Sequence, residues 1–178
     1  MNTALISWNT RIARAIDRLS EGTGRAVSWL VLLMVLLMVY DVGGRYLFNT
    51  GSVALQELEW HLFAALFLLG GAYTLKHDDH VRLDVIYQSR WMGPRRRAWV
   101  NLFGSLLLLM PFCALVIYSA MPFVTNAYGY NEGSPDPGGL PHRWLLKACI
   151  PLGFAMLMLQ GISLALTSLN ALLGPRDR

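Results

Sequence analysis

The chain has 178 residues, of which 54% are hydrophobic and only 15% are charged, whereas soluble domains carry about 25% charged residues. Its formal net charge of +4 would suit a nucleic-acid-binding protein, but the arginines lie in segments that flank long apolar runs. This distribution is typical of membrane topology signals, so we expect no nucleic-acid partner. The composition excludes an ordinary soluble domain and indicates an integral membrane protein surrounded by lipids.

The first 25 residues form an amphipathic segment with helical periodicity over 3–21. This pattern predicts either a helix that lies in the headgroup layer or an amphipathic helix packed against protein. Gly22 and Gly24 follow, and we expect them to break this helix before the chain turns into the bilayer. A cleaved signal sequence is not expected, because this segment precedes the first apolar run. The apolar face consists of Leu5, Trp8, Ile12, Ile16 and Leu19, opposite the arginines.

Four apolar runs are long enough to cross a membrane. A helix rises ~1.5 Å per residue, so ~20 residues cross a hydrocarbon core of ~30 Å. The sequence therefore predicts an all-α membrane protein, with residues 1–178 forming a single integral-membrane domain. The predicted transmembrane helices are 28–48, 55–75, 98–124 and 145–173.

The distribution of lysine and arginine predicts the orientation in the membrane. The N-terminal segment carries four of these residues and the 76–97 loop carries six, whereas the turn at 49–56 carries none. The positive-inside rule therefore places both termini and the 76–97 loop in the cytoplasm. The 49–56 turn and the 128–144 loop then face outward. Within the cytoplasmic loop, helical spacing predicts a second surface helix over 81–91.

The first span carries two ionisable residues, Asp41 and Arg45, near its outer end. They are four residues apart with the acid first, which is the favourable order for an intrahelical pair. An ionisable residue inside a span costs roughly 2.5–3.5 kcal/mol on insertion scales, so it faces protein or water. Two interpretations stay open: a proton or ion relay, and a salt bridge that anchors the span. In the salt-bridge interpretation, Arg45 would also reach Glu57 or Glu59.

The second span begins with Glu57, Glu59 and Trp60. Acids in the first turns suit the positive end of the helix dipole, and Trp suits the membrane interface. Gly70 and Gly71 lack bulk, so we expect a neighbouring helix to approach closely there.

The later spans carry three further signals. Pro111 lacks a backbone donor and predicts a kink in the third span, whose apolar run exceeds one bilayer thickness. Gln160, near the middle of the fourth span, predicts a hydrogen bond to another helix. Cys113 and Cys149 lie at different depths, so we expect two structural thiols rather than a disulfide.

The outer loop over 131–144 contains three prolines and three glycines, which exclude regular secondary structure. Its polar side chains would serve as metal ligands, as a surface for a partner protein, or only as part of a connector. These side chains are Glu132, Asp136, His142 and Arg143.

The sequence argues against an enzyme, because it has no phosphate loop, no GxSxG and no Cys/His zinc spacing. We expect no cofactor and no bound metal. The alternative is a membrane anchor subunit of a respiratory oxidoreductase that binds haem or quinone, with His61 and His142 as the conceivable haem pair. Four spans without inverted repeats or broken helices are a poor candidate to carry a solute alone. The chain is better interpreted as an accessory or anchor subunit.

Four short patterns occur in order along the chain. They are the Arg45–Asn49 segment RYLFN, an acid at Glu57 or Glu59, the small residues 70–72, and the exit HVRLDV at 80–85, which contains His80, Arg82 and Asp84. In this order and spacing they resemble the small membrane subunit (DctQ-type) of tripartite ATP-independent periplasmic (TRAP) transporters. The resemblance covers the layout of all four spans. The loop at 132–144 departs from it, because it is longer and richer in Pro and Gly than in compact members.

The resemblance implies a role as a scaffold subunit in the bacterial cytoplasmic (inner) membrane. In this family the small subunit associates with a large permease subunit, and a periplasmic solute-binding protein delivers organic acids, with uptake driven by a sodium gradient. The large subunit holds the ion and substrate sites. We expect Glu132, Asp136, His142 and Arg143 to help dock the solute-binding protein. The expected structural or subunit-interface residues are Asp41, Arg45, Tyr46, Glu57, Glu59, Trp60, His80, Arg82 and Asp84.

Overall fold

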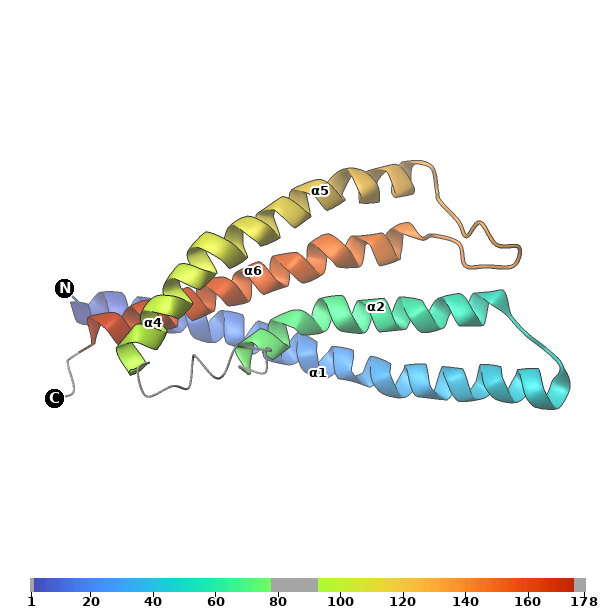
Figure 1. Cartoon of the computed structure of the whole chain (residues 1–178), viewed down its shortest axis with the longest axis horizontal. Helices are drawn as coiled ribbons and strands as arrows, with labels where there is room; N and C mark the ends of the chain where they lie inside the picture. Colours follow the sequence, from blue (N-terminus) through green and yellow to red (C-terminus); the bar gives the residue numbers. More distant parts are fainter. Residues whose placement is uncertain (1, 78–92, 175–178) are drawn as a thin grey trace.

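The computed structural model describes residues 2–77 and 93–174, and it consists of long helices arranged in a bundle (Figure 1). Within these described ranges, four helices are long and apolar enough to cross a membrane, which confirms the predicted all-α architecture with four spans. The third of these helices is continuous from Pro94 to Gly129. In chain order the helical segments are α1 (Asn2–Phe48), α2 (Val53–Lys76), α4 (Pro94–Phe103), η1 (Gly104–Leu109), α5 (Met110–Gly129) and α6 (Trp144–Leu173).

Helix α1 is a single helix of 47 residues, so the predicted break at Gly22 and Gly24 is wrong. A glycine inside a helix costs only about 1 kcal/mol relative to alanine, and here a contact with another helix favours it. Gly24 is buried, and a Cβ atom there would overlap the ring of Tyr73 on α2. At ~1.5 Å per residue, α1 is about 70 Å long and extends well beyond one bilayer thickness.

Helix α6 lies at the centre of the bundle and contacts α1, α2, α4, η1 and α5. Figure 1 shows it between α5 on one side and α1 with α2 on the other. The buried apolar residues are mostly small, such as Ala72, Ala120 and Ala165, whereas Phe67 and Leu108 are exposed. Small residues between helices and large apolar residues outside are expected where lipid surrounds the bundle.

The third span passes through Pro111 without a break. Immediately before it, residues Gly104–Leu109 adopt a π-helix, and the N–H of Met110 donates to the C=O of Ser105. This wider turn accommodates a proline, which cannot donate to the helix ladder. The continuous helix from Pro94 to Gly129 has 36 residues, about 54 Å, so it exceeds one bilayer thickness as predicted.

Candidate functional site

The outer loop is fixed to the second span by the carboxylate of Glu57, which lies in the first turns of α2. The hydroxyl of Ser134 donates to Glu57 Oε1, and the backbone N–H of Leu140 donates to Oε2 at 2.7 Å. Only 4% of Glu57 is exposed. A Cβ atom at Gly139 would lie 2.9 Å from the same Oε2, so glycine permits this close approach. Glu57 therefore organises the loop, whereas the sequence had suggested Arg45 as its partner.

The ends of this loop are held by contacts with α2, α5 and α6. Lys147 on α6 donates to Glu132 at 2.5 Å and lies 3.9 Å from the ring centroid of Phe123 on α5. The N–H of Arg143 donates to the C=O of Glu132 at 2.9 Å, and its guanidinium lies 5.5 Å from the ring centroid of Trp60. Two of the four predicted docking residues, Glu132 and Arg143, thus stabilise the loop itself.

The other two predicted docking residues, Asp136 and His142, are exposed. The backbone N–H of Asp136 donates to Ser134 Oγ at 3.1 Å, and the His142 ring lies 3.1 Å from Asn131 Oδ1. His142 and Asn131 adopt positive φ angles of 60° and 47°, which L-residues rarely do. The tip of the loop therefore has a defined shape with polar side chains facing outward. In the described part of the chain, no cluster of three potential metal ligands occurs.

Asp41 and Arg45 form the predicted intrahelical ion pair through Asp41 Oδ2. Asp41 is only 3% exposed, and its other oxygen, Oδ1, has no hydrogen-bond partner among the described residues. One oxygen of Glu59, Oε1, is likewise buried without a described partner. The neighbouring residues Tyr46 and Trp60 are 82% and 45% exposed. The outer ends of α1 and α2 therefore combine unsatisfied carboxylate oxygens with exposed aromatic side chains.

At the opposite end of α2, Glu21 of α1 binds the side chains of a lysine and a histidine. Lys76 donates to Glu21 at 2.5 Å, and His77 Nε2 lies 2.9 Å from the same oxygen. Glu21 precedes the 28–48 span, and hydrogen bonds from Lys76 and then His77 lower its pKa to about 2. No pattern in the sequence indicated this contact. The predicted family residues His80, Arg82 and Asp84, and the predicted surface helix over 81–91, lie outside the described residues.

A buried polar network joins α1 to α6. Gln160 Nε2 donates to Asp17 at 3.0 Å, Ser163 Oγ donates to the same carboxylate oxygen at 2.7 Å, and Ser20 Oγ donates to Gln160 Oε1 at 2.7 Å. The predicted interhelical hydrogen bond of Gln160 is therefore confirmed. Each side chain serves a contact between helices.

The same face of α1 continues toward its N-terminus, where Asn9 Nδ2 donates to Asn170 Oδ1 at 3.0 Å. Trp8 and Leu19, from the predicted apolar face, are 64% and 51% exposed. The N-terminal part of α1 therefore packs on α6 through small and polar residues, and Trp8 and Leu19 point away from the bundle. This part of α1 thus contacts protein through a face that the apolar periodicity did not indicate.

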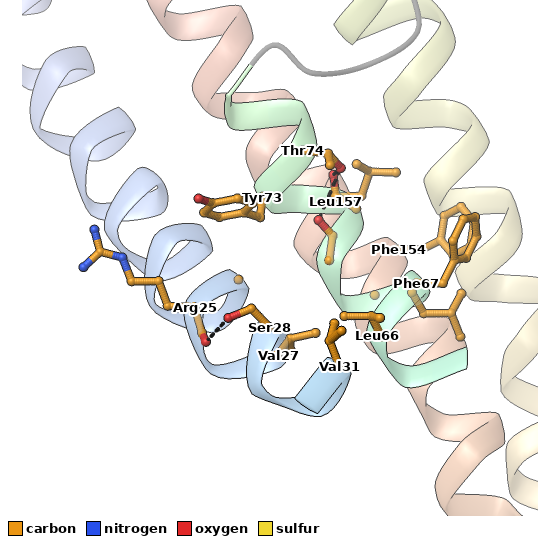
Figure 2. A pocket seen from close by; sticks show the side chains of 15 residues that line it. Arg25, Val27, Ser28, Val31, Leu66, Phe67, Tyr73, Thr74, Phe154 and Leu157 are labelled. Carbon is orange, nitrogen blue, oxygen red and sulfur yellow. Dashed lines mark hydrogen bonds between the residues drawn. The ribbon is translucent and has the colours of Figure 1, made fainter. Parts of the chain in front are cut away.

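An apolar groove of about 580 Å³ lies between α1, α2 and α6. Figure 2 shows Val27 and Val31 from α1, Phe67 from α2, and Phe154 and Leu157 from α6 around it. Its lining is mainly apolar, so the groove suits lipid tails or other apolar groups.

Gly70 and Gly71 also line this groove, and a Cβ atom at either would meet nothing within 4 Å. Among the described residues, no other helix of this chain therefore approaches closely at these two glycines. The close approach occurs instead at Gly153 of α6, where a Cβ atom would lie 2.5 Å from the C=O oxygen of Leu68 on α2.

Comparisons with known proteins place this architecture in a family. The family model for the DctQ component of tripartite ATP-independent periplasmic transporters matches residues 34–171. The ectoine TRAP transporter small permease protein TeaB of Halomonas elongata is 26% identical over 144 residues, which cover 79% of this chain and 70% of TeaB. The C4-dicarboxylate TRAP transporter small permease protein DctQ of Vibrio cholerae is 23% identical over 179 residues, which cover 89% of this chain and 75% of that protein.

A putative TRAP transporter small permease protein of Haemophilus influenzae is 25% identical over 113 residues, which cover 64% of this chain and 69% of that protein. No solved structure matches the chain. The matched region 34–171 contains the ion pair of α1, Glu57, the outer loop and Gln160. The chain therefore belongs to the DctQ family, the small permease subunits of TRAP transporters.

Proposed function

We propose that this chain is the fixed scaffold subunit of a sodium-coupled TRAP transporter that imports an organic acid. Small permease subunits of TRAP transporters work with a large permease and a periplasmic binding protein in the inner membrane. The observation that carries the scaffold role is the network of Asp17, Gln160 and Ser163. Buried polar side chains in this network bind one another between helices, so they rigidify the bundle rather than line a path for a solute.

The proposal of an organic acid is a statement about chemical class. One relative is named for C4-dicarboxylates and another for ectoine, so the solute differs among small subunits of similar sequence. Because the large permease of this family is expected to hold the substrate and ion sites, this chain does not need to encode the solute. The solute bound by the cognate binding protein would identify it.

The sodium coupling and the solute class are tested together with the complete complex. The large permease, this chain and the binding protein loaded with a radiolabelled organic acid would be studied in proteoliposomes. We expect uptake with an inward sodium gradient and none when potassium replaces sodium on both sides. Uptake at the same rate in potassium, or a binding protein that retains no organic acid, would contradict the proposal.

We further propose that the exposed tip of the outer loop helps to dock the binding protein. Asp136 and His142 are exposed there, while Glu57, Glu132 and Lys147 hold the loop in place. A polar surface on a fixed loop suits recognition, because little conformational freedom is lost on binding. The loop extends beyond the outer ends of α5 and α6 (Figure 1), on the side assigned to the periplasm by the charge distribution.

A further inference from the structure

A second cavity, of about 640 Å³, lies where the outer end of α1 meets the turn into α2. Asp41, Gly43, Gly44 and Thr50 are among the residues that line it. The turn is closed by Thr50, whose N–H and hydroxyl both donate to the C=O of Gly44, at 3.2 Å and 3.1 Å. A Cβ atom at Gly43 would meet nothing within 4 Å. The cavity therefore has a fixed wall and an open side on which another chain has room to approach.

The cavity contains a carboxylate that is only partly neutralised. Asp41 is 3% exposed, and Arg45 binds its Oδ2 while Oδ1 has no described partner. A buried polar atom without a partner is costly, and more so at membrane depth, where water does not satisfy it. Native proteins leave few such atoms unpaired. Asp41 Oδ1 is therefore suited to a hydrogen-bond donor from outside this chain.

The charge of the cluster indicates the kind of donor. Leu55 of α2 lines the cavity, and Glu59 lies one helical turn later on the same face, with Oε1 buried and unpartnered among the described residues. The carboxylate that lines the cavity is that of Asp41, and Arg45 binds only its Oδ2. A carboxylate oxygen binds a charged donor about twice as strongly as a neutral one, so Asp41 Oδ1 favours a Lys or Arg side chain.

The rim of the cavity is apolar and accessible. Tyr40, Leu47 and Phe48 line it and are 70%, 76% and 74% exposed. We propose that this cavity is a docking site for the large permease subunit, which inserts a Lys or Arg side chain that donates to Asp41 Oδ1. The proposal rests on the large permease as partner and not on the driving ion or the solute. A failure of sodium coupling would therefore leave it intact.

The first test separates the docking role of Asp41 from its intrahelical pair. A tagged small subunit would be co-expressed with the large permease and purified in mild detergent. We expect Asp41→Asn to lower the recovered large permease about tenfold, because the neutral amide oxygen no longer forms a charge-assisted hydrogen bond with the partner's cation. Arg45→Gln should lower it less, because Asp41 stays available to the partner's cation. The exposed Asp136→Asn is the matched control and should have no effect.

Unchanged recovery with Asp41→Asn would overturn the proposal. So would an equal loss with Arg45→Gln, which would mean that only the intrahelical pair is important. Sodium-dependent thermal stabilisation of the small subunit alone, abolished by Asp41→Asn, would identify a small-cation site in place of a docking site and would also overturn it.

A second test leaves Asp41 intact and so avoids any folding defect. Leu47 would be replaced by the photo-crosslinking residue p-benzoylphenylalanine in the co-expressed complex. We expect an adduct with the large permease, mapped by mass spectrometry to a segment that contains Lys or Arg. An adduct with lipid alone, with a second copy of this chain, or with the binding protein alone would contradict the proposal, as would the absence of any adduct.

Discussion

At the scale of single residues, Glu57 shows what a sequence predicts and what it does not. An acid near the start of the second span was expected, because acids suit the positive end of a helix. Its partners were not, because Ser134 and Leu140 lie more than seventy residues later in the chain. Their position depends on a loop with positive φ angles at Asn131 and His142, which local sequence rules do not specify at non-glycine residues.

The first prediction concerns the hydrogen bonds of Glu57. Glu57→Ala should speed amide hydrogen exchange at Leu140 about tenfold, because the N–H loses a charged acceptor. Glu57→Gln should have a smaller effect, since an amide oxygen still accepts one hydrogen bond. Exchange would be followed by mass spectrometry on peptides from the loop, with Asp136→Ala as the exposed control. Equal exchange in all four proteins would show that the loop does not depend on Glu57.

The ion pair of Asp41 and Arg45 also shows what the sequence predicts and what it does not. Their spacing predicted the pair, and the structure contains it. The spacing gave no indication that one oxygen of Asp41 would have no described partner. That property depends on which hydrogen-bond donors the fold brings to this oxygen, which is a tertiary feature.

At the scale of helices, the hydropathy of the sequence predicted the four spans closely, because a bilayer sets the length of an apolar helix. Hydropathy did not predict which helix faces pack against one another. The N-terminal part of α1 binds α6 through Asn9, Asp17 and Ser20, and Trp8 is exposed. In lipid, apolar faces need no protein cover, so polar and small residues mark the interface. The rule that apolar faces point inward applies to water-soluble bundles and failed here.

The glycines give the second prediction, with a control within the same bundle. Gly153→Ala should destabilise the protein by about 1–3 kcal/mol, because its methyl group would be forced against the Leu68 backbone and would separate α6 from α2. Gly70→Ala should be neutral or stabilising by up to about 1 kcal/mol, since the added methyl group would meet no atom within 4 Å and alanine improves helix propensity. Thermal unfolding in detergent, read by size-exclusion chromatography, compares the two. If Gly70→Ala proved the more damaging, the α2–α6 packing described above would be wrong.

At the scale of the whole molecule, the family and its partners follow from the sequence more reliably than the surfaces do. Span layout and short motifs identified a TRAP small subunit, and the match over residues 34–171 confirms it. This assignment replaces the alternative of a respiratory anchor subunit. His61 Nδ1 instead lies 2.5 Å from the C=O oxygen of Glu57, one turn earlier in α2. Which faces meet the large permease was not predictable, because an exposed apolar side chain suits a lipid tail as well as a partner helix.

The third prediction concerns the surface formed by the tip of the outer loop. Charge reversal by Asp136→Lys should lower uptake at limiting binding protein, because the exposed carboxylate is part of the proposed docking surface. Uptake at saturating binding protein and co-purification with the large permease should stay unchanged. Lys147→Met, which removes an ion pair that holds the loop, should instead lower thermal stability. Loss of the complex with Asp136→Lys would show that the tip is structural.

The central claim is that this chain supports a transporter without itself carrying the solute. The most direct measurement is uptake of the binding protein's solute into proteoliposomes that contain this chain alone, or this chain with the large permease, each with binding protein and a sodium gradient. The scaffold role predicts background counts for the chain alone and uptake only when the large permease is present. Sodium-dependent uptake by the chain alone would contradict it.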